Sequence, residues 1–333
     1  MDIKYCFFIL GVIIIHQLSF YIGKFFNIKD LPSSNRKLHS DPIVCSGGLA
    51  IFLSFFLMIY LLNLPLVVNN IFIFGCYISI LGLIDDKFSI DPFIRIFMQV
   101  AIISYFLYST NLYLEDIVIN DKITISLGAL KELITIIAIV FVINSFNYID
   151  GIDGLCSIIF ISLIISFMLL VNEKYFLIYT LTPVLIFLIY NFNFFKFPKL
   201  YLGDNGSTLL GFLIASFSIY FAKNYSGQYQ IADTMIIWIL AFISFEFIAT
   251  SLSRVLRKKG IFTSGNDHIH YILLNKYNSK YKVVFILSFL NIFFILLGYY
   301  INQYFSNYAF IFFILIFFLY FYFREKMLKN KVG

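Results

Sequence analysis

The sequence predicts an all-α integral membrane protein with about 11 transmembrane helices. Its composition is 61% hydrophobic and only 13% charged, whereas a soluble domain is roughly 45–50% apolar and about 25% charged. Its apolar stretches approach the ~20 residues that a membrane helix needs, without the alternation of ~10-residue barrel strands. These observations exclude a soluble globule, and a chain this apolar is also too hydrophobic to be disordered.

The apolar stretches define the expected spans in order. The first continues to Tyr21 without a small-residue cleavage site, so we interpret it as a retained helix and not as a signal peptide. The predicted spans lie near residues 3–25, 47–63, 67–84, 93–110, 128–146, 154–171, 175–195, 206–222, 232–253, 283–303 and 307–323. Between the fourth and fifth spans, Asn120-Asp121 separates two β-branched runs, which predicts a small extracytoplasmic β-hairpin over residues 117–125. Because the sequence has no long linker or repeat, we expect residues 1–333 to form a single polytopic membrane domain.

The positive charges predict the orientation of this domain. With the N-terminus outside and the C-terminus in the cytoplasm, 19 of the 24 Lys and Arg residues face the cytoplasm, as the positive-inside rule requires. The net charge of +6 is therefore an orientation signal, and no nucleic-acid partner is expected.

Five aspartates fall on the predicted cytoplasmic face: Asp85, Asp86, Asp150, Asp153 and Asp204. Each stands beside a glycine or another acid. Alone, each motif is explained by a helix end or a turn. Together on one face they favour a site for Mg²⁺ and phosphate, because Mg²⁺ takes oxygen ligands and adjacent acids need a cation or a proton between them.

Two further polar features lie within or just after the ninth span. His268 and His270 lie in a predicted polar loop after the basic run from Arg254 to Lys259. Imidazole can donate a hydrogen bond to phosphate, so the two histidines are candidate phosphate ligands. The basic run by itself is explained by anchoring at the cytoplasmic membrane surface. Glu246 lies inside the span and is either a functional buried acid, a buried partner of Arg254 or an interfacial residue.

In order along the chain, these motifs resemble the polyprenyl-phosphate N-acetylhexosamine-1-phosphate transferases, the superfamily of phospho-N-acetylmuramoyl-pentapeptide transferase. The resemblance runs from about Asp30 to Tyr271. It rests on Asn35-Arg36-Lys37-Leu38-His39 with Ser46-Gly47-Gly48, on Ile84-Asp85-Asp86-Lys87 with Arg95, on Asn147-Tyr148-Ile149-Asp150-Gly151-Ile152-Asp153-Gly154, on Leu202-Gly203-Asp204-Asn205-Gly206-Ser207, and on His268-Ile269-His270. Tyr271 stands where the family usually has a third histidine, and Glu246 where it often has Asp.

The resemblance implies transfer of N-acetylhexosamine 1-phosphate from a UDP-N-acetylhexosamine to undecaprenyl phosphate, with release of UMP, as the first step of a cell-surface polysaccharide such as O-antigen, capsule or wall polymer. It implies the bacterial inner membrane as the location, membrane lipid as a partner and Mg²⁺ as the cofactor, with Mn²⁺ as a substitute. It leaves a homodimer open.

The same resemblance assigns roles to residues. Asp86 and Asp204 are expected to bind the metal, and Asp85 to act as base or positioner for the lipid phosphate. Asn147, Asp150, Gly151 and Asp153 are expected to hold the nucleotide sugar. The cationic and imidazole groups are expected to face phosphates or the acceptor headgroup: Lys87, Arg95, His268, His270, Arg36 and Lys37.

Two other functions compete. One is the phospho-N-acetylmuramoyl-pentapeptide transferase reaction of peptidoglycan synthesis. The other is a transporter, which should carry ionisable groups near the bilayer midplane and not at one surface.

Overall fold

The protein is a helical bundle in its computed structural model, which describes residues 3–30, 42–120, 122–171, 174–225, 233–260, 265 and 267–329. Within these residues the helices are α1 (Ile3–Phe25), α2 (Gly47–Leu61), α3 (Leu66–Phe88), α4 (Pro92–Thr110), α5 (Lys131–Ile149), α6 (Leu155–Leu170), α7 (Tyr175–Asn191), α8 (Gly203–Tyr225), α9 (Asp233–Ile239), α10 (Ala241–Leu256), α11 (Ile269–Tyr277), α12 (Lys280–Phe305) and α13 (Ala309–Lys329). Short 3₁₀ turns occur at Gly128–Leu130, Phe194–Lys196 and Ser306–Tyr308.

Many of these helices have the length and composition of membrane spans. Among the described residues, 6 stretches are long and apolar enough to cross a bilayer, and the last of them, Lys280–Lys329, contains both α12 and α13. Three shorter apolar helices, α2, α6 and α7, accompany them. The predicted all-α, multi-pass membrane architecture is therefore confirmed, while the count of 11 spans stays a prediction.

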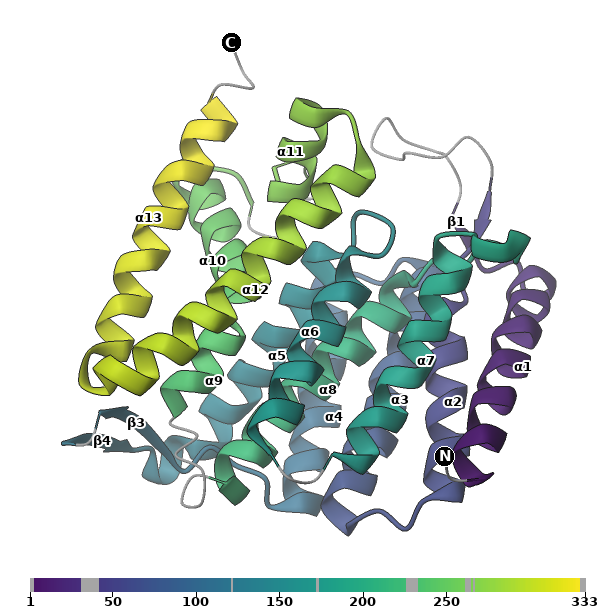
Figure 1. The fold of residues 1–333 in the computed structure, drawn as a ribbon, viewed down its shortest axis with the longest axis horizontal. Coiled ribbons are helices and arrows are strands. Elements are labelled where there is room, and N and C mark those ends of the chain that lie inside the picture. The colour runs from purple at the N-terminus through teal and green to yellow at the C-terminus, as the bar shows by residue number, and fades with distance from the viewer. Residues whose placement is uncertain are drawn as a thin grey trace.

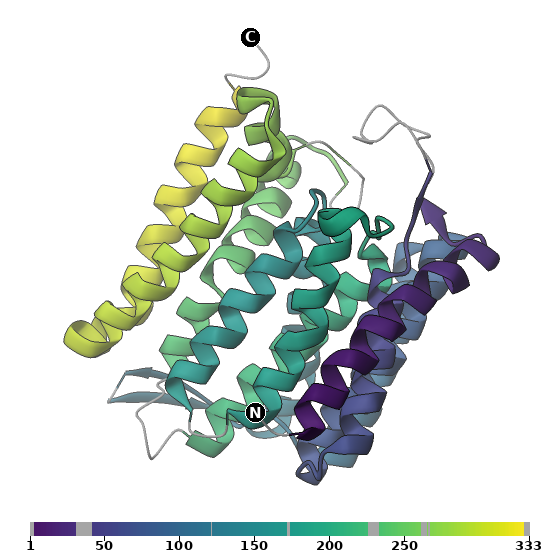
Figure 2. The ribbon, with the colours of Figure 1, turned by 45° about the vertical axis from the view of Figure 1, so that its right-hand side comes forward.

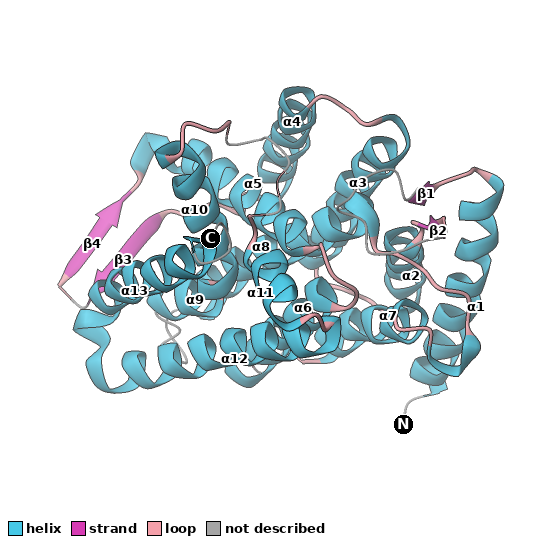
Figure 3. Ribbon diagram, turned by 90° about the horizontal axis from the view of Figure 1, so that it is seen from above, coloured by secondary structure: helices cyan, strands magenta, loops and turns pink. Residues whose placement is uncertain are grey.

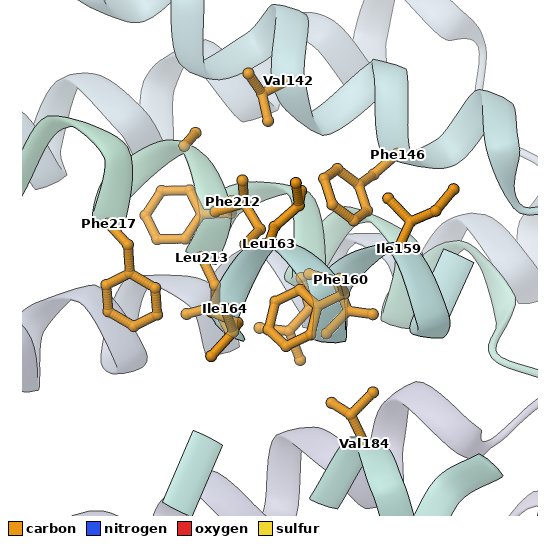
Figure 4. Packing of buried hydrophobic residues seen from close by; sticks show 14 of the residues in the cluster. Val142, Phe146, Ile159, Phe160, Leu163, Ile164, Val184, Phe212, Leu213 and Phe217 are labelled. Atoms are coloured by element: carbon orange, nitrogen blue, oxygen red, sulfur yellow. The ribbon is translucent and has the colours of Figure 1, made fainter. Parts of the chain in front are cut away.

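Helix α8 is the centre of the bundle. In its most apolar stretch 94% of the residues are buried, against 28% in α1 and 22% in α4. Figure 3 shows α8 enclosed by its neighbours when the bundle is viewed from above. Figure 4 shows the packing, in which Phe212 and Phe217 of α8 lie among apolar side chains such as Phe146 of α5 and Phe160 of α6. Helices in membranes associate through van der Waals packing of this kind.

The outer helices expose their apolar side chains. Helices α12 and α13 lie together along one side of the bundle (Figure 2), and on α13 Phe318, Tyr322 and Phe323 are each more than half exposed. Large exposed apolar surfaces are unusual in soluble proteins. This surface suits contact with lipid chains.

The two ends of the bundle carry different small sheets. Strands β3 (Asp116–Asn120) and β4 (Ile123–Ser126) pair antiparallel, with Ile117 opposite Ile125, which confirms the predicted hairpin. Strands β1 (Lys29–Asp30) and β2 (Ile43–Val44) pair at the opposite end, where α11 and the C-terminal end of α13 also lie (Figure 1). The candidate site is at this second end.

The ninth predicted span differs from the expectation. Residues 232–253 were expected to form one helix, but α9 and α10 are separate helices that meet at Leu240. The interruption is local, because the Leu240 amide still donates to the Ile236 carbonyl at 3.1 Å and its carbonyl accepts from the Ser244 amide at 3.0 Å. The helical hydrogen bonds of Leu240 thus continue across the junction of α9 and α10, and the irregularity is confined to that residue.

Candidate active site

The start of α8 is held in place by an aspartate from another helix. The Asp86 carboxylate, in the last turn of α3, accepts hydrogen bonds from the backbone amides of Asp204 at 2.9 Å and Asn205 at 3.2 Å. These amides belong to the first turn of α8, where backbone donors lack a partner within the helix. Gly203 has φ +75°, and a Cβ there would lie 2.7 Å from Asp86 Oδ2, so a side chain would clash as well as strain the backbone.

A second aspartate in the same turn is joined to α8 through an arginine. Asp85 Oδ2 accepts from Arg95 Nη1 at 2.8 Å, and the same nitrogen lies 3.3 Å from Asp204 Oδ2. Asp85 Oδ1 accepts from the Ile90 amide at 2.8 Å. Arg95 therefore ties α3, α4 and α8 together and neutralises part of the charge that the three aspartates bring.

Asp204 is more accessible than Asp85. Its side chain is 39% exposed, whereas that of Asp85 is 7% exposed. Its second oxygen, Oδ1, accepts from Asn147 Nδ2 at 2.8 Å, and Asn147 also contacts Ser207 Oγ at 3.2 Å. Asp204 is thus oriented by hydrogen bonds to both oxygens and still reaches the surface of the cluster, so a ligand can approach it.

The Asp-Gly-Ile-Asp-Gly segment after α5 carries two acids in different surroundings. Burial raises the pKa of the Asp150 carboxyl well above its ordinary value, and the Asp204 and Asp153 carboxylates raise it further. Asp153 pairs with Lys199 Nζ at 2.9 Å and with Lys280 Nζ at 3.4 Å. These three side chains border a cavity of about 400 Å³, which is also lined by Asn191, Phe192, Asn278, Ser279, Tyr281 and Val284.

The expected polar loop is wrong for His270, which is helical, and both histidines are buried. His268 precedes α11 and His270 lies in its first turn, and they are 8% and 0% exposed. Their rings are parallel with centroids 5.5 Å apart, and a Cβ on Gly151 would lie 2.1 Å from His270 Nε2. A glycine at position 151 is therefore what allows this imidazole to pack against the Asp150–Asp153 segment.

Both imidazoles are neutral near pH 7. Burial, and next the charge of Arg254, lower the pKa of His268 to about 4. Burial, and next His268, lower the pKa of His270 to about 3. A neutral imidazole still donates one hydrogen bond. If either imidazole contacts a phosphate, it therefore does so as an uncharged hydrogen-bond donor.

Glu246 is buried with a different partner from the one considered in the sequence. It is 0% exposed and pairs with Arg324 of α13, Oε2 to Nε at 3.2 Å. Arg254 instead forms two hydrogen bonds to Asp267, at 2.9 and 2.7 Å. Burial opposes the ionisation of Asp267, but these bonds and the Arg254 charge outweigh it and lower the pKa of Asp267 to about 2. The expected pairing of Glu246 with Arg254 is therefore wrong, and its place near the membrane interface stays a prediction.

Lys87, the remaining predicted cation among the described residues, lies apart from the aspartate cluster. Lys87 is exposed, with its ammonium 5.3 Å from the centroid of the adjacent Phe88 ring. Arg36 and Lys37 lie outside the described residues. Three cations that do form contacts near the site were predicted only to lie on the cytoplasmic side: Lys199, Lys280 and Arg324. No local pattern in the sequence singles them out, because their partners are remote along the chain.

The carboxylates could hold a hard cation only if a bound substrate supplied further oxygen ligands. Within the described ranges, no group of three or more His, Cys, Asp and Glu side chains is arranged to hold a metal ion. Mg²⁺, however, usually takes one or two carboxylates and completes its shell with phosphate oxygens and water. An exposed carboxylate on Asp204, beside Asp85 and Asp86, suits that kind of shared site.

Comparison with known proteins agrees with this arrangement. The family model for glycosyl transferase family 4 matches residues 68–222, the segment that contains Asp85, Asp86, Asn147 and Asp204. The chain is 28% identical over 314 residues to the undecaprenyl-phosphate alpha-N-acetylglucosaminyl 1-phosphate transferase of Haemophilus influenzae, covering 88% of this chain and 85% of the relative. It is similar to the proteins of the same name from Pasteurella multocida, 29% identical over 289 residues (80% of this chain, 79% of the relative), and Thermotoga maritima, 28% identical over 271 residues (81% and 80%).

Proposed function

We propose that the chain is a member of glycosyl transferase family 4 that transfers N-acetylglucosamine 1-phosphate from UDP-N-acetylglucosamine to undecaprenyl phosphate and releases UMP. The match of residues 68–222 to the family model and the shared name of the three relatives support this proposal. The observation that carries this proposal is a hydrogen-bonded cluster at one end of a membrane bundle, in which Arg95 joins Asp85 to Asp204. Asn147, from a further helix, binds Asp204 directly. N-Acetylglucosamine is proposed from the names of the three relatives. The product would begin a cell-surface polysaccharide.

The proposed topology has 11 spans, with the N-terminus outside and the site at the cytoplasmic face of a bacterial inner membrane. The basic C-terminal end of α13 and the candidate site share one end of the bundle, and the β3–β4 hairpin lies at the other. The positive-inside rule then favours the cytoplasm for the site. This location suits the chemistry, since the lipid acceptor stays in the bilayer and the nucleotide sugar comes from the cytosol.

Mg²⁺, or Mn²⁺ in its place, is proposed to bind through Asp204 and Asp86. The support is the chemistry of their side chains, which offer only oxygen ligands. A divalent ion would neutralise the diphosphate oxygens and the charge that develops on the departing UMP. Asp86 would then have a second duty, because its carboxylate already holds the first turn of α8.

The reaction itself requires positioning more than acid–base chemistry. An oxygen of undecaprenyl phosphate forms a bond to the β-phosphorus of the UDP-sugar, and the bond from that phosphorus to the bridging oxygen breaks. UMP leaves with the electron pair. A phosphate monoester has its second pKa near ~6, so it is already largely ionised and needs no base.

The protein's contribution is therefore to hold charges in fixed places. We favour Asp85 as a positioner, since its carboxylate is engaged by Arg95 and by the Ile90 amide. Arg95 would face the phosphates while keeping Asp85 and Asp204 in register, and Asn147 would fix the orientation of Asp204.

The UDP-sugar is proposed to lie toward Asp150, Gly151 and Asp153. The cavity beside Asp153 supports this, because Lys199 and Lys280 border it and supply positive charge. His268 and His270 would approach the same ligand from α11 as neutral hydrogen-bond donors. Lys87, Arg36 and Lys37 would attract the acceptor headgroup and anionic membrane lipid.

The peptidoglycan reaction is less well supported, because the three relatives share the N-acetylglucosaminyl name. A transporter is disfavoured because the aspartate cluster lies at a bundle end. The test is Mg²⁺-dependent exchange of label between UMP and UDP-N-acetylglucosamine in membranes that contain the protein and undecaprenyl phosphate. The proposal predicts exchange that depends on the lipid, and a transporter would produce none.

A further inference from the structure

We propose that Glu246 and Arg324 are positioning residues that hold His268 and His270 at the active site, although neither touches the aspartate cluster. The inference rests on the proposed function for its kinetic readout, because it assigns the histidines to the UDP-sugar side of that site. It also predicts a change in backbone protection that needs no catalytic activity.

Glu246 holds the backbone just after His268. Its Oε1 accepts from the Ile269 amide at 2.8 Å and from Thr250 Oγ1 at 2.9 Å. Its Oε2 accepts from Tyr320 Oη at 2.6 Å and from Arg324 Nε at 3.2 Å. The carboxylate thus links the start of α11 to α10 and α13.

Arg324 holds the backbone just before His268. Its Nη2 donates to the Asp267 carbonyl at 2.6 Å and to Thr250 Oγ1 at 2.7 Å. Arg324 and Glu246 are both 0% exposed. The ion pair therefore fixes the peptide groups on both sides of His268. Arg324 comes from a helix that lies 57 residues after Asp267 in the chain.

Stability alone does not account for this pair. Taking two charges out of water is costly, and well-packed apolar residues of similar size are often as stable or more so. Apolar side chains could fill the same space between α10 and α13, but they could not bind the Asp267 carbonyl and the Ile269 amide. Those two backbone contacts are what the charges add.

The held segment is joined to the site by packed contacts. Arg254 binds Asp267 through two hydrogen bonds, and the His268 ring lies edge-on to Tyr148, one residue after Asn147. His270 packs against Gly151 at a distance that leaves no room for a Cβ. A shift of the segment would therefore move both imidazoles relative to Asn147 and Asp150.

The first test replaces Arg324 by lysine. Arg324→Lys keeps the positive charge beside Glu246 but removes the planar group that reaches the Asp267 carbonyl and Thr250 together. We expect a folded protein whose kcat/KM for the UDP-sugar falls about 10–100-fold, the usual loss when a group that orients a binding residue is removed. The KM for undecaprenyl phosphate should change little. Lys326→Met, an exposed cation on the same helix, is the matched control and should behave as wild type.

The second test separates positioning from stability. The double variant Glu246→Leu/Arg324→Met leaves no unpaired buried charge, so its apparent melting temperature should stay close to that of wild type. Its kcat/KM for the UDP-sugar should nevertheless stay as low as in Arg324→Lys. Hydrogen exchange at the Ile269 amide should be faster in the double variant and unchanged in Lys326→Met.

The outcomes divide cleanly. Recovery of both melting temperature and kcat/KM in the double variant, or wild-type kinetics in Arg324→Lys, would show a purely structural pair and overturn the inference. Unchanged protection of the Ile269 amide in the double variant would also overturn it. If the wild-type protein transfers no sugar phosphate at all, the proposed function fails, and the exchange measurement alone decides the positioning inference. If the double variant does not fold, Arg324→Lys decides it.

Discussion

A methyl group added at Gly82 should inactivate the enzyme although it replaces no polar side chain of the site. Gly82 lies on α3 one turn before Asp86, and a Cβ there would stand 2.5 Å from Asn205 Cα and 2.7 Å from Asn205 N. Ordinary contact begins at 3.4 Å, so α3 and the start of α8 would have to separate by about 0.9 Å. The atoms in the way are backbone, which cannot rotate aside.

The separation would act on the hydrogen bonds that assemble the site. Asp86 reaches the Asp204 amide at 2.9 Å, and a further 0.9 Å or so would break that bond. Overpacking of this kind costs about 1–3 kcal/mol of stability, and a misplacement of ~1 Å in a catalytic site costs on the order of 100-fold in rate. We therefore expect Gly82→Ala to fold and insert but to lose about 100-fold in kcat.

Gly75→Ala provides the matched control. Gly75 is on the same helix and faces the same partner, but its Cβ would meet the tip of the Leu209 side chain at 3.0 Å, which can move. Both substitutions gain the same helix propensity, so this term cancels. Initial rates of lipid product formation in detergent, normalised to folded protein, measure the difference. The reasoning is refuted if Gly82→Ala stays within twofold of Gly75→Ala.

Four further outcomes are expected. Asp204→Asn should abolish transfer while the protein still inserts, because it removes a carboxylate that is 39% exposed and open to a ligand. More than about a tenth of wild-type activity would remove Asp204 from the proposed metal site. EDTA should stop the reaction and Mg²⁺ or Mn²⁺ should restore it, and full activity in a metal-free preparation would contradict the metal proposal. His268→Ala should lower kcat/KM for the UDP-sugar about 10–100-fold with little change for the lipid, and Tyr271→His should be tolerated; kinetic constants within twofold of wild type in His268→Ala would return this segment to a membrane-anchoring role. The folded-state pKa values of His268 and His270 are about 4 and about 3, below the ordinary value of 6.5. As the pH falls, the unfolded chain therefore binds protons before the folded protein does, which favours unfolding. The apparent melting temperature should drop between about pH 6.5 and pH 4, and the drop should be smaller in His268→Ala.

The sequence predicted the parts of the site that local patterns determine. Asp85 and Asp86 end an apolar helix, Asp204 begins one, and the positive-inside rule assigned both ends to one face. The β-hairpin over residues 117–125 followed from a turn dipeptide between β-branched runs. Such features depend on a few neighbouring residues, so they can be recognised before the fold is known.

Pairings between distant segments could not be predicted in this way. Glu246 had a basic residue two turns away, Arg254, yet its partner Arg324 comes from the last helix, 78 residues later. The histidines were expected in a polar loop because their neighbours are polar, but Arg254 and Asp267 satisfy each other and allow the rings to be buried. The break at Leu240 has no Gly or Pro to signal it. Which helices pack together decides all three.

The most direct test of the proposed reaction follows the β-phosphate. Purified protein is incubated with undecaprenyl phosphate, Mg²⁺ and UDP-N-acetylglucosamine that carries ³²P in the β-phosphate, with other UDP-sugars in parallel. The account predicts that the label enters the lipid product and that UMP is released in equal amount. Release of UDP, with the label left in the nucleotide, would mean transfer of the sugar alone and would contradict it.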